Sequence, residues 1–554
     1  MNRKKERKKE QAWRETVVES EIREGEMTMA SLGDDEEALV TRYHGRICAC
    51  GNACPHYGAP LEEGELNDGV ITCPYHFARY HVEDGRLVSP PSLDGIASYP
   101  VKVEGGKVMI GSAEQPRIAM PSGRDDRTFL IAGGGAAGNA AAEQLRREGF
   151  SGRIVMLTPE SDRPYDRPMI SKGLLSGDAE PGWLPLRSEA FYRRLQIDIR
   201  TGSGITSLDP GSRTVTMEDG RTLSGDRILL ATGSRPRRPD IPGGGLPNVF
   251  ALRSAADGRA ILSAVNGGGG DREGGAAGGG VRRALILGAS FIGMEVAAEL
   301  AQRGIEVHVA APEEVPMSLA FGERIGAWVR TIHEENGVVF HMGTTARELK
   351  GEASGNGGVE TALLSDGSSV DADIVIYGLG VDPVVDYLDE TGLVRSGAVP
   401  VNDRLETEAE GVFAAGDIAA VDTLGRTGVR VEHWVVAQKQ GRHAAGAMLG
   451  QTEPYAEVPF FWTRQYTTSL KYIGFPGPAD RIAYSGDVGS GSFAAGFFTR
   501  DVSGDGPQKG PGERIRGAAA LGRNGALIAI ERAILEGRAV GYDDFGGLVG
   551  GGTG

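Results

Sequence analysis

The segment CPHYGAPLEEGELNDGVITCPYH, residues 54–76, is the most informative feature of the first part of this chain. It contains two short motifs, Cys54-x-His56 and Cys73-x-x-His76, separated by sixteen residues. Two thiolates and two imidazoles in this arrangement suit a 2Fe–2S cluster in which the cysteines hold one iron and the histidines the other. We therefore expect the chain to carry single electrons.

A structural zinc ion is the alternative for the same four ligands. Zinc ligand pairs are usually of one type, two cysteines or two histidines close together, whereas each motif here offers one of each. The pattern favours the cluster and leaves zinc open.

Short β-like runs between residues 46 and 88 are separated by Gly, Asn and Asp, which predicts a small all-β domain.

Through CPHYGAP and CPYH, residues 16–112 resemble Rieske ferredoxin domains. Phe77 stands where these domains usually carry glycine, and Ala59 and Tyr75 stand where respiratory members carry extra cysteines. Ala78 replaces a serine that donates to a bridging sulfide in those proteins. Fewer donors to sulfur stabilise the reduced cluster less, so we expect a potential near the low end of the Rieske range, roughly −150 mV.

The chain has four cysteines, and none follows Cys73. This excludes a structural disulfide framework for the remaining residues. The two cysteines outside the motifs, Cys48 and Cys50, do not fit plant-type ferredoxin spacing. We expect them to be small buried residues on a strand.

A nucleotide-binding pattern begins at residue 128 with TFLIAGGGAAGNAAAEQLRR. An apolar strand leads into Gly133-x-Gly135-x-x-Gly138 and then a helix, where the glycines serve a tight turn, close approach of a pyrophosphate and helix–strand packing. The helix N-terminus would face the phosphates. The next strand, RIVMLTPE, ends at Glu160, whose carboxylate is placed to hold ribose hydroxyls.

A second such unit, ALILGASFIGMEVAAELAQRGIEVHVAAPEE, repeats the pattern with Gly288, Ser290 and Gly293. Serine is small enough to let a pyrophosphate approach the backbone. The position at the end of the second strand where a ribose-binding acid is expected is occupied by Ala311. Glu313, two residues later, is the candidate to replace it. Because no Arg or Lys stands nearby for a 2′-phosphate, the sequence favours NADH over NADPH.

These two units, with ATGSRPRRPDIPG, YGLGVDP and LETEAEGVFAAGDIA, resemble the pyridine-nucleotide flavoprotein reductase family. RPYDRPMISK resembles its flavin loop, and VEHWVVAQKQGRHAAGAMLG resembles its segment beside the isoalloxazine. The resemblance implies FAD contacts by Arg167, Lys172, Ala231, Thr232, Gly233 and Asp417, and an NAD contact by Gly380. It implies catalytic positions for Lys172 near the reactive ring, Trp434 at the nicotinamide side and Glu295 as a polar nicotinamide contact.

Many members of that family carry a redox-active cysteine pair beside the flavin, and this chain has none there. A disulfide-reductase mechanism is therefore excluded, which leaves the ferredoxin-reductase branch. VPFFWTRQYTTSLKYIGF, from residue 458, resembles the C-terminal β-rich domain of that branch, and 525–537 is expected to form a closing helix. Glycine-rich patches at 266–280, 351–358, 503–512 and from Gly546 are expected to be flexible loops or tails.

The whole chain, over roughly residues 20–540, resembles the apoptosis-inducing factor 3-like family, a Rieske domain fused to a ferredoxin-reductase-like flavoprotein. We expect a multidomain fold: a small all-β Rieske domain, two α/β Rossmann-like domains for FAD and NAD, and an α+β C-terminal domain. The expected segments are a basic tail (1–15), the Rieske domain (16–112), a linker (113–126), the FAD-binding domain (127–248 and 385–452), the NAD-binding domain (249–384) and the C-terminal reductase domain with a glycine-rich tail (453–554).

The expected function is NAD(P)H-dependent electron transfer through FAD and a 2Fe–2S cluster to an acceptor the sequence does not name. The alternatives are the reductase component of an oxygenase system and a redox-responsive signalling protein with slow turnover. A formal charge of −16 argues against nucleic acid as a partner. No apolar run is long enough for a membrane span, so we expect a cytoplasmic protein, and the oligomeric state is left open.

Overall fold

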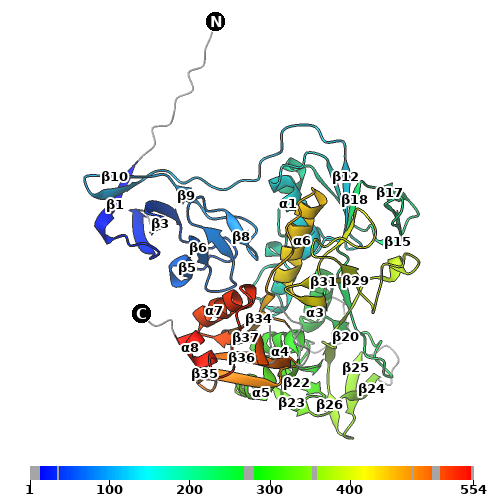
Figure 1. Ribbon diagram of the computed structural model, residues 1–554. Helices are drawn as coiled ribbons and strands as arrows, with labels where there is room; N and C mark the ends of the chain where they lie inside the picture. The colour runs from blue at the N-terminus through cyan, green and yellow to red at the C-terminus, as the bar shows by residue number, and fades with distance from the viewer. Residues whose placement is uncertain are drawn as a thin grey trace. The chain divides into compact units, whose positions relative to one another are not determined.

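The computed structural model describes residues 13–33, 36–267, 280–351, 358–475, 478–501 and 512–550. It divides into two compact units, Met1–Ala119 and Met120–Gly554 (Figure 1). The glycine-rich patches at 266–280, 351–358 and 503–512 lie mostly outside the described residues. Among the described residues, no helix combines the length and apolar character needed to cross a membrane.

The first unit is built from three antiparallel sheets, as the all-β prediction requires. Strand β1 begins at Arg14, inside the expected tail, because Arg14 and Glu15 pair with Ile110 and Met109. The sheets are β1-β11-β10 (Arg14–Val18, Lys107–Ile110, Val101–Glu104), β2-β3-β4-β9 (Thr28–Gly33, Glu36–Tyr43, Arg46–Gly51, Ser98–Tyr99) and β5-β6-β7-β8 (Glu65–Asn67, Val70–Thr72, Arg79–His81, Leu87–Ser89).

The second unit contains a parallel sheet that follows the first glycine motif. Its strand order is β14-β13-β12-β18-β30, so the strand after the motif lies at its centre. Its elements are β12 (Thr128–Ala132), α1 (Ala136–Arg147), β13 (Arg153–Leu157), α2 (Glu189–Arg194), β14 (Ile197–Arg200), β18 (Arg227–Leu230), β30 (Val412–Ala414) and α6 (Trp434–Met448). The small sheets β15-β16-β17 (Ile205–Asp209, Thr214–Met217, Thr222–Ser224) and β29-β31-β32 (Val399–Val401, Ala419–Thr423, Arg426–Val429) complete it.

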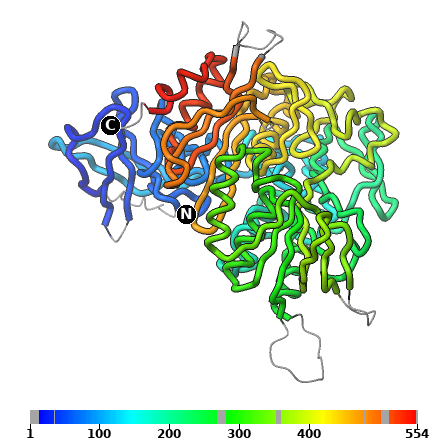
Figure 2. Tube along the Cα trace, turned by 90° about the horizontal axis from the view of Figure 1, so that it is seen from below, coloured from blue at the N-terminus to red at the C-terminus, as the bar shows by residue number. Residues whose placement is uncertain are grey.

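The last strand of this sheet and α6 come from residues after 384, so the chain leaves the sheet and returns to it. Helix α6 packs against α1, and the return of the yellow segment beside the cyan one can be followed in Figures 1 and 2. This brings residues near 417 and 434 to the glycine loop that follows β12.

The inserted segment forms a second parallel sheet of order β20-β27-β21-β22-β23. Its apolar core is formed on one side by α4 and α5 and on the other by the sheet β24-β25-β26. The bounds are β20 (Val249–Ala251), α3 (Ala255–Val265), β21 (Arg283–Leu287), α4 (Phe291–Gln302), β22 (Glu306–Ala311), α5 (Ser318–Glu334), β23 (Val339–Met342), β24 (Ala346–Gly351), β25 (Val359–Leu364), β26 (Ser369–Asp371) and β27 (Ile374–Tyr377). Strands β19 (Ser234–Pro236) and β28 (Val381–Pro383) pair where the chain crosses between the two sheets.

The C-terminal part is an antiparallel sheet of order β33-β34-β37-β36-β35 with two helices. Strand β33 contacts α4 of the inserted segment, which both views show as orange beside green. The bounds are β33 (Phe460–Gln465), β34 (Thr468–Gly474), β35 (Arg481–Asp487), β36 (Ser492–Asp501), β37 (Gly512–Leu521), α7 (Asn524–Leu535) and α8 (Phe545–Gly550). The expected closing helix is α7, but the prediction of a flexible tail from Gly546 is wrong up to Gly550, because buried Phe545 anchors α8.

Candidate cofactor sites

Two loops of the first unit present the four predicted cluster ligands, and both have the same backbone geometry. In one, the Cys54 amide donates to the Ala59 carbonyl at 2.9 Å and the Gly58 amide donates to the Cys54 carbonyl at 2.8 Å. In the other, Cys73 donates to Ala78 at 2.8 Å and Phe77 donates to Cys73 at 3.2 Å. Each loop follows a strand and turns its cysteine inward.

The matching geometry of the two ligand loops shows that Phe77, which replaces the usual glycine, adopts a strained backbone conformation. Gly58 has φ of 74°, and Phe77, at the same place in the other loop, has φ of 60°. This left-handed conformation costs a residue with a side chain roughly 1–2 kcal/mol. Phe77 is only 4% exposed, so burial of its ring offsets that strain.

The four ligands form two pairs rather than one tetrahedral group. The His56 and His76 Nδ1 atoms lie 3.1 Å apart, and the buried Cys54 and Cys73 side chains hydrogen-bond each other. Among the described residues, no three His, Cys, Asp or Glu side chains are grouped as ligands of a single ion. Two cysteines on one side and two histidines on the other fit a two-iron cluster.

Tyr80 is a contributor to this site that the sequence did not reveal. Its hydroxyl lies 3.0 Å from Cys54 Sγ, and its side chain is fully buried. The hydrogen bond from Cys73 lowers the pKa of the Cys54 thiol to about 6 against the opposing effect of burial, and Tyr80 adds to the lowering. The missing hydroxyl at Ala78 is therefore partly compensated. Its signal in the sequence is a tyrosine two residues after that position.

The histidine pair lies between two exposed aromatic side chains. Tyr57 is 48% exposed and its ring centroid is 4.0 Å from that of His56. Tyr75 is 46% exposed and lies 6.3 Å from His76. The cysteine side of the site is buried, whereas the histidine side faces solvent with apolar rings around it.

The second unit contains a cavity of about 710 Å³, within the size range of cofactor sites. Its walls come from both parallel sheets, α6 and strand β33. Thirteen of the predicted site residues line it: Gly133, Gly135, Glu160, Arg167, Lys172, Ala231, Thr232, Gly233, Ser290, Glu295, Gly380, Asp417 and Trp434. Residues far apart in the sequence therefore surround one space.

The first glycine motif forms a close backbone cradle at one end of this cavity. Gly133 has φ of 125°, and a Cβ there would lie 2.0 Å from the Ala231 carbonyl oxygen. A Cβ on Gly138 would lie 2.0 Å from the Gly133 carbonyl oxygen, whereas one on Gly135 would meet nothing within 4 Å. The open position faces the cavity beside the N-terminus of α1, where a pyrophosphate would be bound.

Glu160 is already engaged by neighbouring side chains of the flavin loop. It pairs with the Arg167 guanidinium and accepts a hydrogen bond of 2.5 Å from the Tyr165 hydroxyl. Arg167 also donates to the Arg253 carbonyl at 3.0 Å. This network anchors the predicted ribose-binding carboxylate at the cavity wall.

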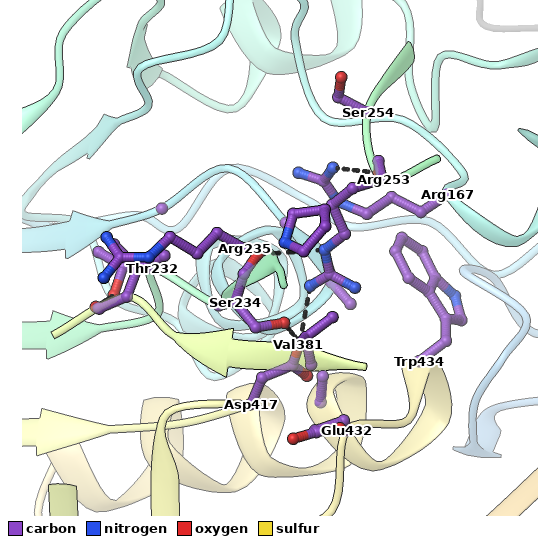
Figure 3. Close-up of a pocket in the computed structure, with 18 of the residues that line it drawn as sticks. Arg167, Thr232, Ser234, Arg235, Arg253, Ser254, Val381, Asp417, Glu432 and Trp434 are labelled. Carbon is purple, nitrogen blue, oxygen red and sulfur yellow. Dashed lines mark hydrogen bonds and ion pairs between the residues drawn. The ribbon is translucent and has the colours of Figure 1, made fainter. Parts of the chain in front are cut away.

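Asp417 forms the other charged anchor of the cavity. Its carboxylate accepts hydrogen bonds of 2.6 Å from Ser234 Oγ and 2.7 Å from Arg253 Nη2, as Figure 3 shows. Burial opposes ionisation, but Arg253 and Ser234 outweigh it and hold the pKa of Asp417 below its usual range. Sequence reasoning missed Ser234, although it lies in the ATGSRPRRPDIPG segment, and Arg253, which lies in no recognised segment.

Lys172 and Glu295 form an ion pair of 2.8 Å between the two sheets. Glu295 is 2% exposed, and its oxygens also accept from Ser171 and Thr463. The structure therefore gives this carboxylate a pairing role that the sequence did not predict. The Lys172 ammonium lies 5.8 Å from the centroid of the Trp462 ring on β33, a second cavity residue that was missed.

The second glycine motif repeats the first. A Cβ on Gly288 would lie 2.5 Å from the Gly378 oxygen, and one on Gly293 would lie 2.0 Å from the Gly288 oxygen. Ser290 is the N-cap of α4 and makes no side-chain capping bond. The backbone of this second glycine motif therefore fits a nucleotide, as the backbone of the first motif does.

Glu313 does not line the cavity, but its backbone occupies the position that Glu160 has in the first nucleotide-binding segment. Its carbonyl accepts from Gly343 at 3.1 Å, just as the carbonyl of Glu160 accepts from Gly202 at 3.0 Å. Glu313 is thus the structural counterpart of Glu160. Its Oε2 atom is buried and has no hydrogen-bond partner among the described residues.

Both parts of the chain match known protein families. A profile described as Pyridine nucleotide-disulphide oxidoreductase matches residues 127–441, and one described as Rieske [2Fe-2S] domain matches residues 12–100. Apoptosis-inducing factor 3 of Homo sapiens is 33% identical over 94% of this chain and 83% of its own length. The anthranilate 1,2-dioxygenase system ferredoxin–NAD(+) reductase component of Burkholderia cepacia is 34% identical over 74% of this chain and 94% of its own.

A solved ferredoxin reductase for the CYP199A2 system from Rhodopseudomonas palustris covers 76% of this chain and 97% of its own, with 27% identity and a TM-score of 0.67. The predicted fold class and cofactor set are confirmed. The chain therefore belongs to the pyridine nucleotide-disulphide oxidoreductase family, as an NAD(P)H-dependent, ferredoxin-reductase-like FAD enzyme that also carries a Rieske 2Fe–2S domain.

Proposed function

We propose that this enzyme passes electrons from NADH through FAD to its own Rieske cluster and then to an external protein acceptor. One observation carries the proposal: a cysteine-free flavin cavity and a two-plus-two ligand centre occur in the same chain. Without a thiol pair, the cavity has no disulfide to reduce. The cluster loops supply the only other redox site for which the sequence offers ligands.

The residues of the second unit divide the work of binding and orientation. Bound FAD would accept a hydride from the nicotinamide and supply electrons singly to the cluster. The glycine loop at 133–138 would hold its pyrophosphate, Glu160 its ribose and Asp417 its ribityl chain. Lys172 would present positive charge to the reactive ring, and Trp434 would cover the nicotinamide side and help to exclude water.

Glu313 supports the choice of NADH. As the backbone counterpart of Glu160, Glu313 would bring a carboxylate to the end of the strand where ribose hydroxyls bind, and its negative charge would repel a 2′-phosphate. On this proposal the enzyme prefers NADH to NADPH.

The outlet for electrons is the surface formed by His56 and His76 with Tyr57 and Tyr75. Exposed aromatic rings around half-buried ligands suit a transient contact with another protein. The low potential of roughly −150 mV is retained as a proposal, since Ala78 offers no donor to a bridging sulfide and the Tyr80 hydroxyl beside Cys54 compensates only in part. A midpoint above 0 mV would contradict it.

Anaerobic reduction tests the route. NADH should bleach both flavin and cluster, and Cys73→Ser should leave flavin reduction intact while abolishing cluster reduction. Cys48→Ser is the matched control, because Cys48 is buried in the same unit but is not a predicted ligand. Cluster reduction by NADH in a flavin-free preparation would disprove the route.

The acceptor is proposed to be an oxygenase or another redox protein. Several relatives are described as ferredoxin–NAD(+) reductase components of dioxygenase systems, which favours this class. The signalling alternative predicts slow NADH oxidation with every acceptor offered. A panel of oxygenase components, cytochrome c and ferricyanide separates the two.

A further inference from the structure

Both carboxylate oxygens of Glu295 accept hydrogen bonds from neighbouring side chains. Its Oε2 accepts from Ser171 Oγ at 2.6 Å and from Lys172 Nζ at 2.8 Å. Its Oε1 accepts from Thr463 Oγ1 at 2.7 Å. Both oxygens are occupied, so the carboxylate cannot turn without losing a hydrogen bond to Lys172 or to the buried hydroxyls of Ser171 and Thr463.

The hydroxyl of Thr463 is itself held by a chain of buried groups. Gln465 Nε2 donates to Thr463 Oγ1 at 2.9 Å, which leaves Gln465 Oε1 facing His333 Nε2 at 2.8 Å. Thr463 and His333 are fully buried and Gln465 is 1% exposed. Because the amide oxygen can only accept, His333 must donate from Nε2.

The tautomer of His333 then determines the last bond. Burial lowers the pKa of His333 to about 4, so the ring is neutral near pH 7 and its Nδ1 is an acceptor. The Tyr466 hydroxyl lies 3.4 Å from that atom and is its donor. Every donor in the chain from Tyr466 to Thr463 therefore points toward Glu295, and bonds aligned in this way polarise one another.

The backbone at Tyr466 is strained in the position that makes this contact. Tyr466 is the first residue of the two-residue loop between β33 and β34 and has φ of 55°. Glycine is favoured at such loop positions, and a side chain there costs roughly 1–2 kcal/mol. Strain of this kind persists where the surroundings hold the residue in place.

This series of hydrogen bonds joins three parts of the second unit. Lys172 belongs to the flavin loop, Glu295 and His333 to the inserted segment, and Thr463, Gln465 and Tyr466 to the C-terminal hairpin. Arg464 adds a link, since its Nη1 donates to the Lys172 carbonyl at 3.3 Å. The position of the lysine therefore depends on a strand that is distant in sequence.

We propose that Thr463, supported by Gln465, His333 and Tyr466, is a positioning residue that fixes Glu295 and thereby sets the place and effective charge of Lys172 at the flavin. This inference rests on the proposed function, in which Lys172 faces the flavin ring. Thr463 shares the charge of the carboxylate. Without it, Glu295 binds Lys172 more strongly and weakens the positive field in the cavity.

The test compares Thr463→Val, which removes the hydroxyl at constant shape, with Thr463→Ser, which keeps it. Thr468→Val on the neighbouring strand is the matched control. We expect Thr463→Val to bind FAD, to show a lower flavin midpoint potential and to be reduced by NADH about tenfold more slowly in single turnover. Thr463→Ser and Thr468→Val should match the wild type. Tyr466→Phe should shift the potential in the same direction by less.

A Thr463→Val protein with wild-type potential and reduction rate overturns the positioning role. If that variant does not fold, Gln465→Met and Tyr466→Phe decide the question by the same two measurements, and unchanged values in both overturn it. Failure of the proposed function is distinguishable, because the wild type itself would then show no flavin reduction by NADH. A normal wild type with unaffected variants rejects only this inference.

Discussion

The two nucleotide-binding segments of the second unit share one backbone and differ in what surrounds their acids. Gly133 and Gly288 donate to Leu157 and Ala310 at 2.8 and 2.9 Å, and each closes the same strand–loop–helix turn. Glu160 is held by Arg167 and Tyr165, whereas Oε2 of its counterpart Glu313 has no partner among the described residues. A site that retains its cofactor permanently benefits from a fixed acid, and one that exchanges its nucleotide benefits from a free one.

The largest expected effect separates the two glycine cradles. Gly138→Ala should abolish FAD retention, and Gly293→Ala should retain FAD but raise KM for NADH at least tenfold. In each case the new Cβ would lie 2.0 Å from a backbone oxygen, and such overpacking costs about 1–3 kcal/mol. Flavin content and NADH titration measure the two outcomes.

Gly182→Ala is the control for that pair, because a Cβ there meets nothing within 4 Å. It should leave both properties unchanged. Loss of FAD in Gly293→Ala would show that the two cradles do not serve separate nucleotides.

Fully buried His333 and half-buried His433 predict how the stability of the protein changes in acid. Burial lowers the pKa of His333 and of His433 to about 4 from 6.5. The unfolded chain therefore binds more protons between these values, and stability falls as pH drops from 6.5 to about 4. For fully buried His333 the loss is about 3 kcal/mol.

Urea unfolding at pH 7.0 and 4.5 measures this loss, and His333→Asn should flatten it with or without FAD. His433 lines the cavity, so His433→Asn should alter the pH dependence of FAD retention instead. Identical pH profiles for wild type and His333→Asn would contradict the prediction.

Replacing Glu160 should weaken cofactor binding more than replacing its counterpart Glu313. Glu160→Gln removes a charged partner of Arg167 and should weaken FAD binding about tenfold or more, since a charge-assisted bond is worth about 1.5–3 kcal/mol. Glu313→Gln should raise KM for NADH only about threefold to tenfold and reduce the preference over NADPH. Calorimetry of FAD binding and the ratio of kcat/KM for the two nucleotides provide the readouts. A Glu313→Gln enzyme with an unchanged ratio would remove Glu313 from nucleotide selection.

The smallest effect is expected at the middle position of each motif. Ser290→Gly should change KM for NADH by no more than about twofold, because Ser290 makes no capping bond. Gly135→Ser should retain FAD, since a Cβ at Gly135 meets nothing within 4 Å. Loss of FAD in Gly135→Ser would indicate that the pyrophosphate needs the bare backbone there.

Much of the architecture is predictable from local patterns. The strand–glycine–helix order at 128–147 and 284–302 predicts two parallel sheets, and the cluster ligands are recognisable from two short motifs. The acid of the second unit is less accessible, because strand-end counting points to Ala311 while the backbone hydrogen bond from Gly343 identifies Glu313 as the counterpart of Glu160. Ser234, Trp462 and Thr463 lie inside recognisable segments and Tyr80 lies two residues after Ala78, but no local pattern identifies these residues or Arg253 as site contacts, because their partners are distant in sequence.

The chemistry that this protein can carry out is already specified by its amino-acid sequence. Two cysteines and two histidines at set spacings, two glycine motifs and the absence of later cysteines are local facts, and they specify a cluster, two nucleotide sites and no thiol step. The tertiary structure alone decided which side chains act on one another. Contacts such as Thr463 with Glu295 join residues 168 positions apart, and only packing of separate elements around a shared buried charge brings them together.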